Sequence, residues 1–306
     1  MKQIRRFTPW LVGLTLLVIV VTRVPFDLLR ASVQRGEHLQ LAAIHLLASS
    51  TVLFTDAFAT WTGMAALRLR RPFWDVLVVR GATNALFVIS YAVGQGAFGY
   101  YLYKTGIKPL RATGATLFLI GTNLATLLVL TTITWVVGNR AGLNDAVTWT
   151  LVITCSGFVL YLLMVGIAPR FLSRSELFAP LFDAGLRGHA IAMLGRLPHV
   201  VVIVLVQWAA LRAWGIPVPW IIGMALTPVV ILATVLPISP AGLGTAQAAF
   251  AYFFSGFATG ATDAERTGQI VAFGIVHFAY GVGAALLVGL ICLPIARRRG
   301  ALRNDA

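Results

Sequence analysis

Residues 236–250 read LPISPAGLGTAQAAF and interrupt an uncharged stretch that runs from 213 to 262. A helix that crosses a bilayer needs roughly 20 residues, so this stretch is too long for one crossing. Its two prolines remove backbone donors and stop a helix, and its two glycines permit conformations that other residues resist. We predict a helix that ends before Pro237 and a second helix over 245–257, with Thr245 as its N-cap.

A helix that starts inside a membrane leaves several backbone N–H groups without partners, which is costly in hydrocarbon. Such a start must be buried against protein or must face a polar ligand. The positive end of the helix dipole favours an anion, and broken helices line the substrate sites of transporters. The break therefore predicts a site for an anionic group such as a lipid phosphate. The alternative is a packing kink whose amides are satisfied by neighbouring helices.

The composition of the whole chain places these helices in a membrane. Of 306 residues, 58% are hydrophobic and 11% are charged, and the mean hydropathy is +0.86. Soluble domains carry about 25% charged residues, so a soluble globular protein is excluded. A disordered chain is excluded as well, because the content of apolar residues is too high. Long unbroken apolar runs favour helices over the alternating strands of a membrane barrel. We expect an all-α polytopic membrane protein, with residues 1–306 forming a single integral membrane domain.

Apolar runs divide the chain into about eight transmembrane helices. Seven are expected at about 8–24, 39–66, 76–103, 113–138, 146–168, 189–213 and 268–293, and the eighth lies within 213–262 beside a re-entrant piece. The stretch 169–188 mixes charged and aromatic residues, which is typical of an interfacial segment.

The charge of the chain bears on its orientation and its partners. The net charge is +14, and the basic residues lie mostly at the ends of apolar runs, where they act as topology signals and attract anionic lipid. This placement excludes nucleic acid as the expected partner. The basic N-terminus and the basic C-terminus both favour the cytoplasm, which requires an even number of crossings. The alternative, two full crossings within 213–262, makes nine spans and places the C-terminal arginines outside.

Charged residues inside spans are expensive and often functional. Asp56 and Arg80 lie at depths of roughly 16 and 12 Å in adjacent antiparallel spans, so they are expected to pair. The pair could gate or clamp a headgroup, or it could be purely structural. Asn84 follows Arg80 by one turn and shares its face.

Other polar residues are weaker candidates. Arg196, near the start of a span, could bind phosphate or mark the interface. His277 and Tyr280 lie inside the last span as a candidate proton relay, although a buried histidine is more often a hydrogen-bonded core residue. A small-residue stripe, which permits close helix packing within the chain or in a dimer, is formed by Gly281, Ala285 and Gly289.

The motif around 237–247 resembles the lysylphosphatidylglycerol synthase transmembrane-region family of flippase-like membrane proteins. That family has a proline, small residues, Gly-Leu-Gly and a Glu three residues later. Pro237, Gly242, Leu243 and Gly244 match this pattern, whereas Gln247 replaces the Glu.

A second match is weaker. Gly94-Gln95-Gly96 and the basic loop from Lys104 to Arg111 resemble the glycine-rich end of the family's third span, and Gln95 stands where a Glu is common. Asn123 replaces an Asp of the next span. The resemblance implies about eight spans with re-entrant helices, and movement of a lipid or a lipid-linked head between leaflets. With amides at the acidic positions, an anionic or neutral head suits this chain better than a cationic one.

These observations lead to one functional hypothesis and two alternatives. The chain is expected to translocate a lipid or lipid-linked head across the bacterial cytoplasmic membrane, with an anionic or polyprenyl-phosphate-linked lipid as substrate. The alternatives are a non-catalytic assembly subunit, in a homodimer or with another membrane protein, and a membrane-embedded transferase that uses Asp56, Asp75 or Asp183. No catalytic motif, metal site or cofactor is expected. The residues predicted to bind substrate are Arg80, Asn84, Gln95, Arg196, Ser239, Gly242, Gly244, Thr245 and Gln247.

Overall fold

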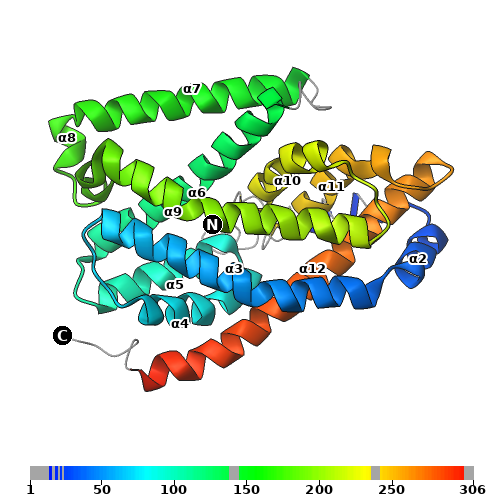
Figure 1. Cartoon of the computed structure of the whole chain (residues 1–306), viewed down its shortest axis with the longest axis horizontal. Coiled ribbons are helices and arrows are strands. Elements are labelled where there is room, and N and C mark those ends of the chain that lie inside the picture. Colours follow the sequence, from blue (N-terminus) through cyan, green and yellow to red (C-terminus); the bar gives the residue numbers. More distant parts are fainter. Residues whose placement is uncertain are drawn as a thin grey trace.

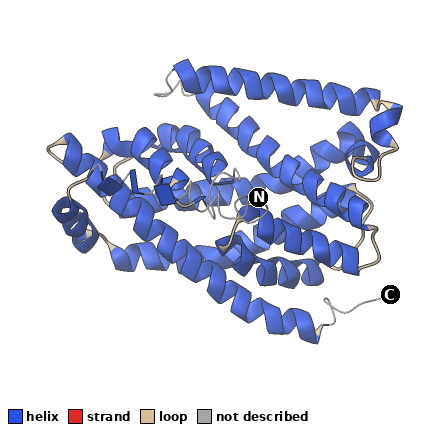
Figure 2. Cartoon of the chain, turned by 180° about the vertical axis from the view of Figure 1, so that it is seen from behind, coloured by secondary structure: helices blue, strands red, loops and turns tan. Residues whose placement is uncertain are grey.

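The computed structural model describes residues 14–15, 18–19, 21–22, 24–137, 145–235 and 242–299. Every regular element within these ranges is a helix (Figures 1 and 2), which confirms the all-α prediction.

Five helices in the described ranges are long and apolar enough to cross a membrane. They are α3 (His38–Ala66), α6 (Pro109–Val137), α7 (Asp145–Ile167), α9 (Ala179–Ala213) and α12 (Asp263–Arg298). Their large apolar side chains are often exposed, for example Leu47 at 75% and Ile153 at 69%, which suits helices whose solvent is lipid. The chain is therefore a multi-pass membrane protein. The expected count of eight spans is not confirmed, and the first expected span lies mostly outside the described residues.

The prediction of a single span at 76–103 is wrong, because two short helices form this segment. The structure has α4 (Phe73–Asn84), a 3-10 turn η1 (Ala85–Val88) and α5 (Tyr91–Lys104). Ser90 is extended and its hydroxyl accepts a hydrogen bond from the Val93 amide at 3.1 Å, so it caps α5. Arg71 Nη2 donates to the Thr105 carbonyl at 3.0 Å, which holds the two ends of the segment together. This first hairpin enters and leaves the bundle at one end.

A second hairpin occupies the uncharged stretch. It comprises α10 (Trp220–Val235), α11 (Thr245–Phe254) and the 3-10 turn η3 (Ser255–Phe257). Its two ends also meet, because the Gln269 side chain donates to the Trp214 carbonyl at 3.5 Å and accepts from the Thr259 amide at 2.9 Å. The two ends of this hairpin thus lie together, and α10 and α11 lie on the far side of the bundle from the first hairpin's open end (Figure 1). The crossing expected within 213–262 is not confirmed, because none of the five long apolar helices of the described ranges lies there.

The predicted start of the second helix is confirmed, since α11 begins at Thr245, whereas the end expected before Pro237 lies outside the described residues. The predicted N-cap was wrong by one residue. Gly244 is the N-cap with φ of 81°, while Thr245 lies inside the first turn and donates to the Gly242 carbonyl at 2.9 Å. The positive φ at Gly244 is a backbone conformation that glycine adopts without strain.

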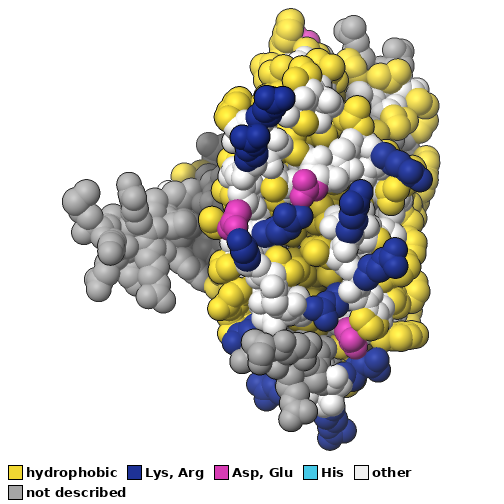
Figure 3. Space-filling model, turned by 90° about the vertical axis from the view of Figure 1, so that its left-hand side faces the viewer, with side chains coloured by type: hydrophobic (Ala, Val, Ile, Leu, Met, Phe, Trp, Pro, Cys, Tyr) yellow, Lys and Arg dark blue, Asp and Glu magenta, His cyan; other side chains and the backbone are white. Residues whose placement is uncertain are grey.

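One end of the bundle gathers most of the basic residues of the described ranges (Figure 3). Ion pairs join the segments there: Arg299 to Asp75 at 3.1 Å, Arg111 to Asp183 at 2.7 Å and Lys108 to Glu176 at 2.6 Å. The segments that meet at this basic end carry Arg68, Arg70, Arg71, Lys104, Lys108, Arg111, Arg170, Arg174, Arg187, Arg297, Arg298 and Arg299. The segments at the opposite end carry Arg30, Arg35, Arg212 and Arg266. This asymmetry is stronger than the sequence suggested, because the first hairpin returns the loop at 104–111 to the side of Arg68.

Shorter helices lie at the two ends. The opposite end holds α2 (Phe26–Arg35), and the basic end holds α8 (Arg170–Ser173). The first turns of α9 are set off by a kink at Gly185, whose φ is 58°. The expected interfacial segment at 169–188 thus corresponds to α8 and these first turns.

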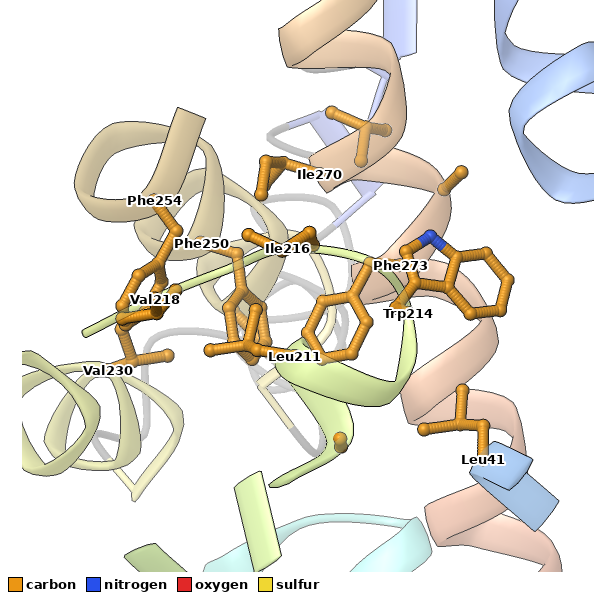
Figure 4. Packing of buried hydrophobic residues seen from close by; sticks show 14 of the residues in the cluster. Leu41, Leu211, Trp214, Ile216, Val218, Val230, Phe250, Phe254, Ile270 and Phe273 are labelled. Carbon is orange, nitrogen blue, oxygen red and sulfur yellow. The ribbon is translucent and has the colours of Figure 1, made fainter. Parts of the chain in front are cut away.

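An aromatic core fixes the second hairpin against α12. Phe250 and Phe273 meet edge to face with centroids 5.1 Å apart, and Phe254, Ile270 and Trp214 pack around them (Figure 4). Such pairs prefer this geometry. On the other face of α12 the small-residue stripe packs within the chain, since a Cβ at Gly289 would lie 2.5 Å from that of Ala85.

Candidate functional site

A cavity of about 290 Å³ lies where the tip of the first hairpin and the end of α10 meet α3, α6 and α9. Its polar walls include Asp56, Arg80, Asn84, Gln95, Asn123 and Arg196. Five of these residues were predicted from the sequence, either as an ion pair or as substrate-binding residues, and the structure brings them together in one cavity. Asn123 was not among the predicted substrate-binding residues.

Asp56 is the centre of this cavity's charge network. Its Oδ2 lies 2.7 Å from Arg80 Nε and its Oδ1 lies 2.8 Å from Arg196 Nη1. Both guanidinium side chains are 5% exposed or less, and the Asp56 side chain is 14% exposed. The pairing of Asp56 with Arg80 is confirmed. The convergence of Arg196 from α9 on the same carboxylate was not predicted.

Neutral groups hold Arg80 in place. Arg80 Nη1 donates to Gln95 Oε1 at 3.3 Å, and its guanidinium carbon lies 5.2 Å from the centre of the Phe98 ring and 5.5 Å from that of Phe87. Such cation–π contacts stabilise a desolvated guanidinium. His199 lies one turn after Arg196, on the same helical face, with Nε2 3.9 Å from Asp56 Oδ1. Arg80 is thus preorganised and need not be ordered by a ligand.

The network carries an excess of positive charge. Two guanidiniums face one carboxylate, and an unpaired charge in a low-dielectric site is costly. Arg196 Nε and Asn123 Oδ1 are buried without a hydrogen-bond partner in the described part of the chain. Buried polar atoms are nearly always paired. Arg196 Nε is an unused donor that an anion would match, whereas Asn123 Oδ1 is an acceptor and would need a donor instead. A small anion matches both the charge and the unused donor.

The start of α11, which was predicted to bind substrate, does not line the cavity. Gln247 is fully buried, its Oε1 accepts from the Gly244 amide at 2.7 Å, and its Nε2 donates to the Gly274 carbonyl at 3.3 Å. The first free amide of α11 is therefore satisfied by the chain itself, as in the packing-kink alternative. Gly242, Gly244, Thr245 and Gln247 do not line the cavity, and Ser239 lies outside the described residues.

The proposed proton-relay residues lie in a separate cluster. His277 Nδ1 is 3.1 Å from His45 Nε2, and the Tyr280 hydroxyl is 3.4 Å from His38 Nδ1. These residues join α12 to α3 and do not line the cavity. A role in proton transfer stays a prediction.

The aspartates of the transferase alternative are held apart. Asp75 pairs with Arg299 and Asp183 with Arg111 at the basic end, whereas Asp56 lies in the cavity. Within the described ranges there is no group of three or more His, Cys, Asp or Glu side chains placed to hold a metal ion. The arrangement favours binding of an anion over acid–base chemistry by paired carboxylates.

Sequence reasoning missed two contributors to the site, His199 and Tyr91. The spacing of Arg196 and His199 by three residues could have indicated a shared face. Tyr91 lines the cavity because α5 restarts beside it after the turn at Ser90, and that turn has no proline or glycine to signal it.

Comparison with protein-family models, with curated proteins and with solved structures finds no match to this chain. The resemblance to flippase-like proteins therefore rests on the motif residues alone.

Proposed function

We propose that the chain translocates a lipid with an anionic head between the leaflets of a bacterial cytoplasmic membrane. The observation that carries this proposal is the cavity in which Arg80 and Arg196 converge on Asp56 inside a bundle of apolar helices. Ionisable residues at such depth are functional by default, and here their summed charge is positive.

The size of the cavity limits which lipid headgroups fit in it. Small-molecule pockets usually measure about 300–1,000 Å³, and this cavity, at about 290 Å³, is at the lower limit. A bare phosphate or a phosphate with a small substituent suits it better than a large saccharide. Phosphatidic acid, phosphatidylglycerol and polyprenyl phosphate share this chemistry.

The neutral amide of Gln95 in the wall of the cavity supports the same class. An aminoacyl ammonium would need a carboxylate to offset its charge, and the one carboxylate described in the cavity, Asp56, is already bonded to two guanidiniums. We therefore infer that the substrate is anionic rather than cationic.

The basic end of the bundle is assigned to the cytoplasm. Lysine and arginine are enriched in cytoplasmic loops, and the ion-paired segments around Arg71, Arg111 and Arg299 hold most of the described basic residues. In this orientation the first hairpin opens to the cytoplasm and the second to the opposite face.

Leaflet exchange in proteoliposomes tests the proposal. The purified protein would be reconstituted in phosphatidylcholine vesicles with traces of labelled phosphatidic acid, phosphatidylglycerol or polyprenyl phosphate, and exposure of the label to an impermeant reagent would be followed. We expect at least one of these lipids to exchange faster than in empty vesicles. If none does, the proposal is wrong.

Charge-matched variants make the test specific to the cavity. Arg80→Gln and Arg196→Gln are expected to slow exchange by about tenfold or more, which corresponds to about 1.4 kcal/mol. Lys108→Gln removes one positive charge from an exposed pair at the basic end and is expected to leave the rate unchanged, because such pairs contribute little. Equal slowing by all three variants would point to surface charge instead.

A further inference from the structure

A groove of about 390 Å³ runs between α5 and α6, from Gln95 toward the basic end. Its walls are mainly small or apolar, with Ala92, Gly96, Gly99 and Ala112 along its length and Tyr103 near its end. From Gln95 to Tyr103 the helix rises about 12 Å. The groove is therefore long and narrow, which suits a chain rather than a compact group.

Two glycines on one face of α5 shape this groove. A Cβ at Gly99 would lie 2.8 Å from Thr116 Oγ1, so Gly99 allows α5 and α6 to approach closely. A Cβ at Gly96, one turn earlier, would meet nothing within 4 Å. Glycine lowers helix stability relative to alanine, and no packing contact at Gly96 requires it. Gly96 leaves open the space beside Gln95.

Gln95 is common to the groove and the central cavity. It lines both, and its Oε1 bonds to Arg80. A larger apolar cavity of about 630 Å³ lies beneath α7, but it shares no lining residue with the central cavity. The shared wall at Gln95, which bonds to Arg80, therefore distinguishes the α5–α6 groove from the larger cavity.

We propose that the α5–α6 groove holds a hydrocarbon chain of the lipid whose anionic head contacts Arg80 and Arg196. This inference rests on the proposed function and adds to it that the substrate is recognised by its chain as well as its charge. Gln95 then stands at the junction of head and chain, where an amide contacts both without adding a charge.

Photolabelling tests the groove independently of transport. The probe is phosphatidic acid with a diazirine at the end of one acyl chain, present as a trace in phosphatidylcholine vesicles that contain the full-length protein. After irradiation, labelled residues are located by mass spectrometry. We expect adducts on α5 and α6 around Tyr103, Thr113 and Thr116. Adducts confined to the surface of α7 and the cavity beneath it would overturn the proposal.

Paired glycine variants provide the control. Gly96→Leu fills the groove, whereas Gly121→Leu, which also has open space at its Cβ, fills the cavity beneath α7. We expect labelling of the groove to fall about tenfold in Gly96→Leu and to persist in Gly121→Leu. The reverse result, or no effect from either variant, contradicts the proposal. Thermal unfolding of both variants checks that they fold.

A second probe separates a bound lipid from bulk lipid. Diacylglycerol with the same diazirine chain has no phosphate, so it is expected to label the groove about tenfold less, and Arg80→Gln is expected to remove this difference. Equal labelling by both probes in the unmodified protein would mean ordinary lipid contact and would overturn the inference. The proposed function would be unaffected by that result, since leaflet exchange is measured separately. Conversely, groove labelling without leaflet exchange would support lipid binding while refuting translocation.

Discussion

Asp56 accepts a hydrogen bond from Arg80 Nε at 2.7 Å inside the bundle, although the two residues lie 24 positions apart on different helices. This pair links α3 to the first hairpin, and the second oxygen of Asp56 extends the link to α9 through Arg196. The cavity therefore depends for its shape on one carboxylate that neutralises part of its charge.

Asp56→Asn should destabilise the protein strongly. Removing one partner of a buried ion pair leaves uncompensated charge and costs about 3–5 kcal/mol, and here two guanidiniums would lose their partner. The measurement is the melting temperature in mild detergent. Asp263→Asn, whose carboxylate is 94% exposed, is the control and should melt like the unmodified protein. An unchanged melting temperature for Asp56→Asn would show that the network is not structural.

The first hairpin can be tested by the sidedness of its ends. In a background without Cys155 and Cys292, single cysteines at Arg70 and Lys108 should react with an impermeant maleimide from one face of oriented vesicles. Cysteines at Arg212 and Ala261 should react from the other face, because both lie at the ends of the second hairpin. A continuous crossing at 76–103 would instead separate Arg70 from Lys108.

Gln247→Leu should lower stability by about 1–3 kcal/mol, because the buried Gly244 amide would lose its acceptor and the Gly274 carbonyl, inside α12, would lose one of its donors. Gln207→Leu is a matched control. Its amide nitrogen is buried without a partner in the described part of the chain, so its loss should be neutral or stabilising. Both changes would be compared by thermal unfolding. Equal losses in the two variants would argue that Gln247 does not cap α11.

Gly289→Leu should disturb the tip of the first hairpin. A Cβ at this position would lie 2.5 Å from that of Ala85 and 3.4 Å from its backbone, and overpacking of this kind costs about 1–3 kcal/mol. Gly283→Leu, on the same helix with nothing within 4 Å of its Cβ, should be tolerated. Melting temperature and leaflet exchange are the measurements. A tolerated Gly289→Leu would mean that α12 can move away from the hairpin.

The bounds of the long helices were predictable because apolar runs and helix-breaking residues act locally. Helix ends at 38, 66 and 167 agree with the expected spans to within a few residues, and the prolines and glycines near 240 predicted a break in the uncharged stretch before α11. The first hairpin was missed because its turn uses an ordinary serine cap at Ser90. A side-chain hydrogen bond of that kind cannot be recognised in a hydropathy profile.

The candidate site was predictable in part for the same reason. Charge inside an apolar run is visible in sequence, so Asp56, Arg80 and Arg196 could be singled out. Their common cavity could not be seen, because α9 reaches Asp56 across 140 positions of chain.

The sequence by itself determined that this protein is helical, lies in a membrane and carries a few buried charges, because composition and periodicity decide the solvent and the local backbone. Only the tertiary structure decided that two helical segments turn back on themselves and that two arginines share one aspartate. Those outcomes depend on contacts between distant segments, and the energy of each contact exists only once the helices have packed.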